Sequence, residues 1–288
     1  MNSIRKISKE EFPKSLLEIP QPPKELYIIG ELPPENAIYL CVVGSRKFTS
    51  YGKDACQKLI DGLRGYPIII VSGLAMGIDT FAHQAALKAG LKTISFPGSG
   101  LSEKVLHPQI NIRLAKEIIE SGGCLISEFE PDFKAAPWSF PMRNRLMAGI
   151  SKAVLIIEAE DKSGTLITAR MATDYNRDVY AVPGSINSLS SKGTNSLIRQ
   201  GATPITCVDD LLLALGFEVK IDENKQAKLF ADCSPEEKEI LDLLREPMSR
   251  DEIIRELGSP TPEVNAMLSI MEIKGLIKEE MGEIRVNI

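Results

Sequence analysis

The sequence is poor in the residues that build metal centres and covalent frameworks. Its 288 residues include 2 histidines, His83 and His107, so a histidine-rich metal centre is excluded. The 5 cysteines are scattered, and no C-x-x-C pair occurs among them. Several lie in or beside apolar runs that resemble strands, as is typical of reduced, buried thiols in a cytosolic protein. We therefore expect neither a disulfide framework nor a zinc site.

Long apolar segments are also missing. No run approaches the roughly 20 apolar residues that a helix needs to cross a membrane. The first residues are charged and have no apolar core of the kind found in signal peptides. We expect a cytoplasmic protein without a membrane partner.

Motifs of nucleotide and acyl chemistry are absent as well. The sequence has no G-x-x-x-x-G-K-[ST] loop, which argues against ATP hydrolysis, and no G-x-G-x-x-G fingerprint, which weakens a dinucleotide interpretation. The segment Gly98-Ser99-Gly100 lacks the G-x-S-x-G spacing of a nucleophile elbow, so no hydrolase triad is predicted. We expect no catalytic residues, no metal and no cofactor.

What the sequence does contain is a strand, a glycine-rich turn and a helix between Pro67 and His83. Residues 68–71 form a short β-branched run, and from Ile78 the apolar period becomes helical. The turn between them contains Ser72, Gly73, Leu74 and Gly77. Such a turn presents free N–H groups at the positive end of a helix, which suits an anion, most often a phosphate. The alternative is a tight turn that uses glycine only for its dihedral angles.

Two further turns have the same design. The apolar run 38–43 is followed by Gly44, Ser45 and Arg46, and the run 154–157 leads to a second small-residue turn. That second turn contains Lys162, Ser163, Gly164 and Thr165. Open α/β sheets bind ligands at the carboxyl edge of their strands. We therefore expect the three turns to converge on one site.

The segment F-P-M-R-N-R at residues 140–145 is the most informative basic point of the chain. Pro141 fits a helix start, where Arg143, Asn144 and Arg145 would face a phosphate. The rings of Trp138 and Phe140 could stack on bases, as in single-strand binders. Alternatively, these two rings belong to the core or an interface, and Arg145 caps a neighbouring helix.

Asp79 and His83 lie one helical turn apart and could form an acid–base pair. We favour the alternative, in which an acid at the start of a helix lies beside a hydrogen-bonded core histidine.

Alternating apolar runs and amphipathic segments predict an α/β fold with a mainly parallel sheet and helices on both faces. The strand candidates are 39–43, 67–71, 92–96, 124–127, 153–157, 179–182 and 204–208. Ahead of this domain (residues 37–216) we predict an extended lead-in (1–36), with Leu26 to Ile29 as a short edge strand. Behind it we predict a linker (217–231) and a small winged-helix-like domain (232–288).

The charge is unevenly distributed. Residues 232–288 contain 14 acidic and 7 basic side chains, whereas the remainder carries 25 acidic and 27 basic ones. A polyanion should therefore meet the first part of the chain, through local basic clusters. We expect the C-terminal domain to contact a protein partner and not to hold DNA.

The motifs together resemble one family. The resemblance depends on six motifs: V-V-G-S-R (42–46), S-G-L-A-M-G-I-D (72–79), F-P-M-R-N-R (140–145), E-A-E-D-K-S-G-T-L-I-T-A (158–169), V-P-G (182–184) and G-T-N-S-L-I-R-Q-G-A (193–202). Together they are similar to DNA-processing protein A, DprA or Smf. The resemblance implies an extended Rossmann fold that dimerises and binds single-stranded DNA. It also implies protection of incoming DNA and loading of the RecA recombinase during natural transformation. One departure is Met76, which stands where the family usually has arginine.

We interpret the chain as a non-enzymatic single-stranded DNA-binding protein. The predicted phosphate-binding residues are Gly44, Ser45, Arg46, Ser72, Gly73, Leu74, Gly77, Phe140, Arg143, Asn144, Arg145, Lys162, Ser163, Gly164 and Thr165. The alternative is a nucleotide phosphoribohydrolase that resembles the lysine-decarboxylase-like family. The corresponding turn of that family reads P-G-G-x-G-T-x-x-E, but here it is K-S-G-T-L-I-T, without the glutamate.

Overall fold

The computed structural model describes residues 3–34, 36–218, 233–244, 246–280 and 282–286. The chain divides into two compact units, Met1–Val219 and Lys220–Ile288, and each is described by itself. From residue 219 onward, the predicted linker lies outside the described residues.

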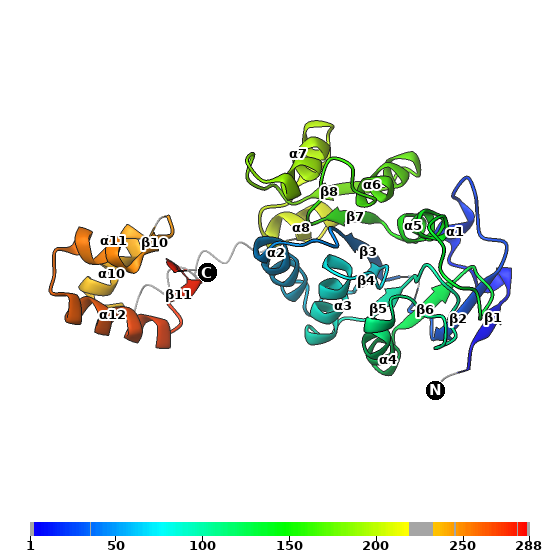
Figure 1. Cartoon of the computed structure of the whole chain (residues 1–288), viewed down its shortest axis with the longest axis horizontal. Coiled ribbons are helices and arrows are strands. Elements are labelled where there is room, and N and C mark those ends of the chain that lie inside the picture. The colour runs from blue at the N-terminus through cyan, green and yellow to red at the C-terminus, as the bar shows by residue number, and fades with distance from the viewer. Residues whose placement is uncertain (1–2, 35, 219–232, 245, 281, 287–288) are drawn as a thin grey trace. The chain divides into compact units, whose positions relative to one another are not determined.

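The first unit is built on a nine-stranded sheet (Figure 1). In spatial order its strands are β1 (Arg5–Ile7), β2 (Leu26–Gly30), β6 (Cys124–Ser127), β5 (Thr93–Ser95), β4 (Ile68–Ser72), β3 (Ile38–Val43), β7 (Ala153–Ile156), β8 (Asp178–Ala181) and β9 (Thr203–Pro204). All pairings from β6 to β9 are parallel, whereas β2 is antiparallel to both β1 and β6. The predicted mainly parallel sheet is confirmed.

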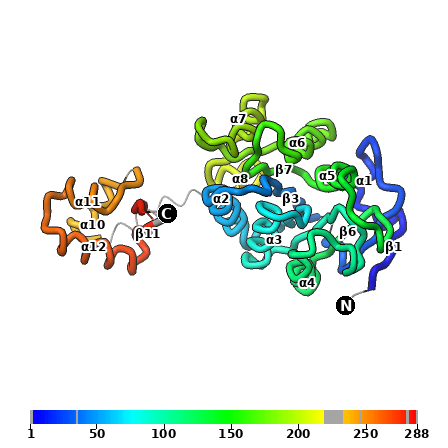
Figure 2. Tube along the Cα trace, viewed as in Figure 1, coloured from blue at the N-terminus to red at the C-terminus, as the bar shows by residue number. Residues whose placement is uncertain are grey.

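Helices cover both faces of this sheet (Figures 1 and 2). One face packs against α1 (Lys14–Leu17), α5 (Ser139–Ile150), α6 (Thr165–Asp174) and α7 (Lys192–Arg199). The other packs against α2 (Ser50–Asp61), α3 (Ile78–Lys88), α4 (Ile112–Glu120) and α8 (Val208–Leu215). Side chains of β3 alternate between the two cores: Cys41 faces the first and Val42 the second. Burial on both faces explains why this strand reads as a continuous apolar run.

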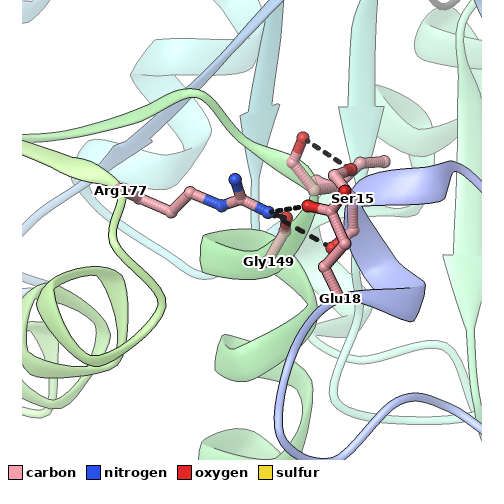
Figure 3. A network of polar contacts seen from close by, with 5 residues as sticks. Ser15, Glu18, Gly149 and Arg177 are labelled. Atoms are coloured by element: carbon pink, nitrogen blue, oxygen red, sulfur yellow. Dashed lines mark hydrogen bonds and ion pairs between the residues drawn. The ribbon is translucent and has the colours of Figure 1, made fainter.

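The lead-in forms two strands; the predicted strand at Leu26–Ile29 is confirmed, but its expected place at the edge of the sheet is wrong. That segment is β2, but β1 pairs outside it and is the edge. Arg177, after α6, holds the lead-in in place (Figure 3): its Nη2 donates to the carbonyls of Gly149 (3.1 Å) and Ser15 (3.3 Å) and pairs with Glu18 (3.4 Å).

The predicted strand 204–208 is wrong beyond its first residue. β9 ends at Pro204, and Val208 begins α8. The cause is a cap: the Asp210 carboxylate accepts hydrogen bonds from the backbone N–H groups of Thr206 (2.9 Å) and Cys207 (3.3 Å). Satisfying these donors fixes a helix start where apolar patterning alone favoured a strand.

The second unit is a winged helix, as the sequence predicts. It contains α10 (Pro235–Leu243), β10 (Met248–Ser249), α11 (Arg250–Leu257), α12 (Thr261–Ile273), β11 (Ile277–Glu280) and β12 (Glu283–Val286). The strands form a three-stranded sheet in the order β10-β12-β11. Ser234 caps α10, because its hydroxyl accepts a hydrogen bond from the N–H of Glu237 at 3.2 Å. The short strand β10 escaped prediction.

None of the five cysteines forms a disulfide; four are buried and Cys207 is exposed. No helix in the part of the chain that the structure describes is long and apolar enough to cross a membrane. Within the same residues, no three metal-ligating side chains come together.

Candidate functional site

The carboxyl ends of the central strands open onto a pocket of about 390 Å³. Its walls are the turn after β3 and the N-terminal turns of α5 and α6. Nine predicted residues line it: Gly44, Ser45, Arg46, Phe140, Arg143, Asn144, Ser163, Gly164 and Thr165. Six do not: Ser72, Gly73, Leu74, Gly77, Arg145 and Lys162. The turn after β4 reaches the pocket through Ala75, so all three turns and the basic segment converge as expected, although only part of the predicted residues line the pocket.

The turn after β3 places two cations at the pocket. The Ser45 hydroxyl closes the turn, because it accepts from the N–H of Lys47 (3.0 Å) and donates to the carbonyl of the same residue (2.8 Å). Arg46 and Lys47 are exposed and line the pocket. The Arg46 guanidinium lies 5.2 Å from the centroid of the Phe140 ring, a cation–π contact that joins two walls.

The turn between β4 and α3 supports the pocket from below. Gly77 has φ = +85°, and a Cβ atom there would lie 2.4 Å from the carbonyl oxygen of Ser45. A Cβ on Gly73 would lie 2.1 Å from Nη1 of Arg143. Both glycines thus make room for neighbouring parts of this chain. The positive φ of Gly77 agrees with the alternative of a turn that uses glycine for its dihedral angles, whereas Gly73 makes room for the Arg143 guanidinium. Met76 is the exposed residue of that turn.

Ser72 and Leu74 belong to the same support. The Ser72 hydroxyl donates to the carbonyl of Val42 at 2.7 Å, and the Leu74 side chain is fully buried. Asn111, which sequence reasoning missed, donates from Nδ2 to the carbonyl of Leu74 at 2.7 Å.

Arg143 lies at the pocket floor and is 5% exposed. Its Nη1 donates to the carbonyls of Gly73 and Phe96, and its Nε donates to Oδ1 of Asn144 at 2.8 Å. Asp79 accepts from the N–H of Gly73 at 3.1 Å. Burial raises the pKa of Asp79, and the positive charge of Arg143 opposes that rise. Arg143 therefore joins α5 to the ends of two strands, and its guanidinium does not extend freely toward a phosphate as predicted.

Arg145 lies away from this pocket, which corrects its placement in the predicted site. It forms an ion pair with Glu128 and donates to the carbonyl of Gln21 at 2.8 Å. Burial raises the pKa of Glu128, and Arg145 opposes that shift. Arg145 lines a separate hollow of about 570 Å³ together with Trp138. It holds the lead-in against α5; neither partner lies at a helix end, so the alternative in which Arg145 caps a neighbouring helix is also wrong.

Trp138 belongs to an aromatic cluster. Its ring centroid lies 5.7 Å from that of Phe129 and 5.4 Å from that of Phe133, both in edge-on geometry. Half of its side chain nevertheless remains exposed, at 55%.

The N-terminal turn of α6 forms the opposite wall. The Thr165 hydroxyl donates to the carbonyl of Gly44 at 3.1 Å, and the Thr165 N–H donates to the Ser163 hydroxyl at 3.2 Å. A Cβ atom on Gly164 would meet open space. Lys162 is exposed and lies between two lining residues, Glu160, which is itself an exposed acid, and Ser163. The hydroxyls of Ser45 and Thr165 thus bond to backbone carbonyls and not to a general base.

Glu158 is a structural residue that sequence reasoning passed over. Its carboxylate is 1% exposed and accepts from the N–H (3.0 Å) and hydroxyl (2.5 Å) of Thr49 and from the hydroxyl of Ser190 (3.1 Å). Thr49 caps α2, so Glu158 connects the start of that helix to β7 and the loop before α7. The sequence signal that could have identified it is a single carboxylate directly after the apolar run 154–157.

His83 is a core histidine, as we favoured. The Thr93 hydroxyl donates to the carbonyl of Ile70 at 2.9 Å, so it accepts from Nδ1–H of His83 at 2.7 Å. Burial, together with the positive charge of Arg143, lowers the pKa of His83 to about 3. The ring is therefore neutral and does not serve as an acid–base partner of Asp79.

Comparison with known proteins shows to which family this chain is similar. Residues 3–216 match the model of DNA recombination-mediator protein A, and residues 225–283 match the DprA winged helix domain. Protein Smf of Escherichia coli is 36% identical over 281 residues, which are 95% of this chain and 74% of that protein. DNA processing protein DprA of Streptococcus pneumoniae is 40% identical over 206 residues, which are 72% of each chain.

Two solved structures also match. DprA of Streptococcus pneumoniae has a TM-score of 0.68 at 38% identity and covers 75% of both chains. DNA processing protein A of Helicobacter pylori, described for its single-stranded DNA binding mode, has a TM-score of 0.66 at 30% identity. That match covers 74% of this chain and 96% of that one. The chain described here belongs to the DNA recombination-mediator protein A family, known as DprA or Smf.

Proposed function

We propose that this protein is a non-enzymatic single-stranded DNA-binding protein. The strand would pass over the pocket along a cationic rim, which we define as Arg46, Lys47 and Lys162. The observation that carries the proposal is the exposure of Arg46 and Lys47 at the pocket, beside the Phe140 ring.

The chemistry of the rim fits this ligand. Exposed cations neutralise phosphates whatever the sequence, and an aromatic ring stacks on any base. The pocket volume of about 390 Å³ falls in the range of small-ligand sites, large enough for part of a nucleotide. The DNA-processing names of the relatives and the binding mode described for the Helicobacter pylori protein support the same ligand.

The cellular role extends this proposal. We assign the protein to DNA processing in natural transformation, as a homodimer in the cytoplasm that protects incoming strands and helps load the RecA recombinase. Three measurements test the role: nuclease digestion of bound oligonucleotides, RecA-dependent strand exchange, and the mass of the particle in solution. Faster digestion, unchanged exchange and a monomer mass would each contradict the corresponding part.

The binding proposal is tested by titrating single- and double-stranded oligonucleotides at several salt concentrations. For three rim phosphates, log K should fall against log salt with a slope of about −2, from about −0.7 per phosphate on single strands. The double variant Arg46→Ala/Lys47→Ala should make that slope shallower by about 1.4.

A matched control removes the same charge elsewhere. Lys58 and Lys88 are exposed in the last turns of α2 and α3, at the sheet edge opposite the pocket. The variant Lys58→Ala/Lys88→Ala should bind like the wild type. Equal losses in both double variants would show that net charge, and not the rim, holds DNA. Release of adenine from AMP by the wild-type protein would contradict the non-enzymatic assignment.

A further inference from the structure

An aromatic pair, in which Phe48 is exposed and Phe81 is half-buried, lies beside the rim and is not part of the pocket. Phe48 follows Lys47 directly and is 44% exposed. Its ring meets that of Phe81, on α3, with the centroids 4.6 Å apart and the planes at 86°. Single exposed apolar residues are common on protein surfaces and need no explanation. Here, however, two rings from different elements are packed together at the surface.

The surroundings of this pair are cationic. Nζ of Lys53, on α2, lies 5.5 Å from the centroid of the Phe81 ring. From Arg46 to Lys53 the chain carries three basic residues and no acidic one; the next acid is Asp54. A surface that combines aromatic rings with cations complements a base and its phosphate better than it complements an apolar protein face.

The packing fixes the orientation of the exposed ring. The edge-on contact with Phe81 holds the Phe48 side chain, while the exposed fraction of Phe48 leaves part of it open to solvent. An aromatic side chain that is already ordered loses little conformational entropy when a ligand stacks on it. We name Phe48, Phe81 and Lys53 the aromatic shelf.

From this arrangement we propose that the aromatic shelf stacks a base of the DNA strand where the strand leaves the pocket, with Lys53 near the adjoining phosphate. The inference rests on the proposed function and deepens it, because it extends the DNA path from the pocket over α2 and α3. The shelf would be tolerant of sequence, since every base presents a flat face.

The test compares Phe48→Ala with Phe48→Trp and with Trp138→Ala. Trp138 is a matched control, because it is an exposed aromatic residue that lines a different hollow. Phe48→Ala should lower affinity for a long oligothymidylate about fivefold or more, in keeping with the stacking energy of one base. Phe48→Trp should retain affinity, and Trp138→Ala should bind like the wild type.

Two readouts separate stacking from other roles. The salt slope should stay unchanged in Phe48→Ala, because no charge is lost, whereas Lys47→Ala should make it shallower by about 0.7. A 2-aminopurine base placed along the strand should be quenched at one position by the wild type and not by Phe48→Ala. Thermal melting of each variant confirms that the protein is folded.

The possible failures are distinguishable. If Phe48→Ala binds normally while Arg46→Ala/Lys47→Ala binds weakly, the shelf is not a DNA contact and the proposed function stands. If the wild type itself does not bind single strands, the proposed function fails first. A change of oligomeric state in Phe48→Ala, with DNA affinity intact, would assign the shelf to contact with a second copy and overturn the inference.

Discussion

Charged and polar residues at and around the pocket form two layers that differ in their surroundings; Arg46, Lys47, Asp79 and Arg143 line the pocket itself, and His83 and Lys162 lie outside its lining. The lower layer, Asp79, His83 and Arg143, is at most 5% exposed, and its hydrogen bonds go to groups of the same chain. The upper layer, the cationic rim of Arg46, Lys47 and Lys162, is exposed. A basic residue in a short motif therefore has one of two tasks, holding turns together or meeting a ligand. Burial distinguishes them.

The largest effect should come from removing the central cation of the lower layer. Arg143→Ala deletes the hydrogen bonds to Gly73 and Phe96 and leaves Asp79 buried without its nearby positive charge. We expect the free energy of unfolding to fall by about 3–5 kcal/mol, as when one partner of a buried pair is removed. Urea unfolding measures this loss.

Arg46→Ala is the control from the upper layer and should unfold like the wild type. If Arg143→Ala kept its stability and lost only DNA affinity, the two layers would have the same task. Arg143 would then be the phosphate contact that its motif predicts.

The next largest effect should be a pH dependence of the free energy of unfolding, which comes from His83 in the lower layer. Burial lowers its folded-state pKa to about 3, from about 6.5 in the unfolded chain. Between these values the unfolded state binds more protons, so stability falls as the pH falls, by up to about 1.4 kcal/mol per pH unit. Between pH 7 and pH 5 we expect a loss of about 2 kcal/mol.

His83→Gln isolates this contribution, because glutamine does not titrate. The raised pKa values of Asp79 and Glu128 act in the opposite direction, and they remain in both proteins. The variant should therefore lose less stability than the wild type between the two pH values. His107→Gln, at an exposed position, is the control and should follow the wild type. Parallel curves for His83→Gln and the wild type would mean that the ring has the same pKa in the folded and the unfolded chain, so that burial does not shift its titration.

The order of strands and helices was readable from the sequence because periodicity reports burial. The runs 38–43 and 68–71 are apolar because both faces of β3 and β4 are covered, and the helices between them begin near small-residue turns. The edge of the sheet was less readable. β1 has three residues, too few for a period, and its pairing with β2 depends on tertiary contacts.

The site was readable in place but not in detail. Three turns and one basic segment were expected to converge, and each of them contributes at least one residue to the pocket lining. Which arginine faces outward could not be predicted, because positions 143 and 145 of α5 are both buried by partners distant in sequence, Phe96 and Glu128. The same holds for Glu158, whose partners Thr49 and Ser190 lie on other elements.

Met76→Arg should add a fourth cation to the exposed upper layer, and so increase the difference in DNA binding between the two layers. Met76 is 51% exposed, and its neighbour Gly77 packs against Ser45 and Arg46, so a cation there would join the rim. We expect tighter binding of single strands and a salt slope steeper by about 0.7. Leu213→Arg adds the same charge at an exposed position of α8 and should change little. No gain in folded Met76→Arg would mean that the turn after β4 points away from the strand.

The smallest effect should come from removing the second unit. A winged helix invites the hypothesis that α12 enters duplex DNA. Yet Lys274, at the end of α12, pairs with Glu237 at 2.7 Å, and α12 exposes Ile270 and Ile273. Residues 232–288 hold 14 acidic and 7 basic side chains, so their net charge repels a polyanion.

A chain that ends at Leu229 should therefore bind single strands within about twofold of the full chain, because the rim lies wholly in the first unit. Titration of both chains with the same oligonucleotide, after a check of their melting and solution mass, measures the difference. A tenfold loss in a folded truncated chain of unchanged mass would place a DNA contact in the second unit. An unchanged affinity would agree with the expectation, drawn from the charge distribution, that the exposed isoleucines and acidic surface of the second unit contact a protein partner.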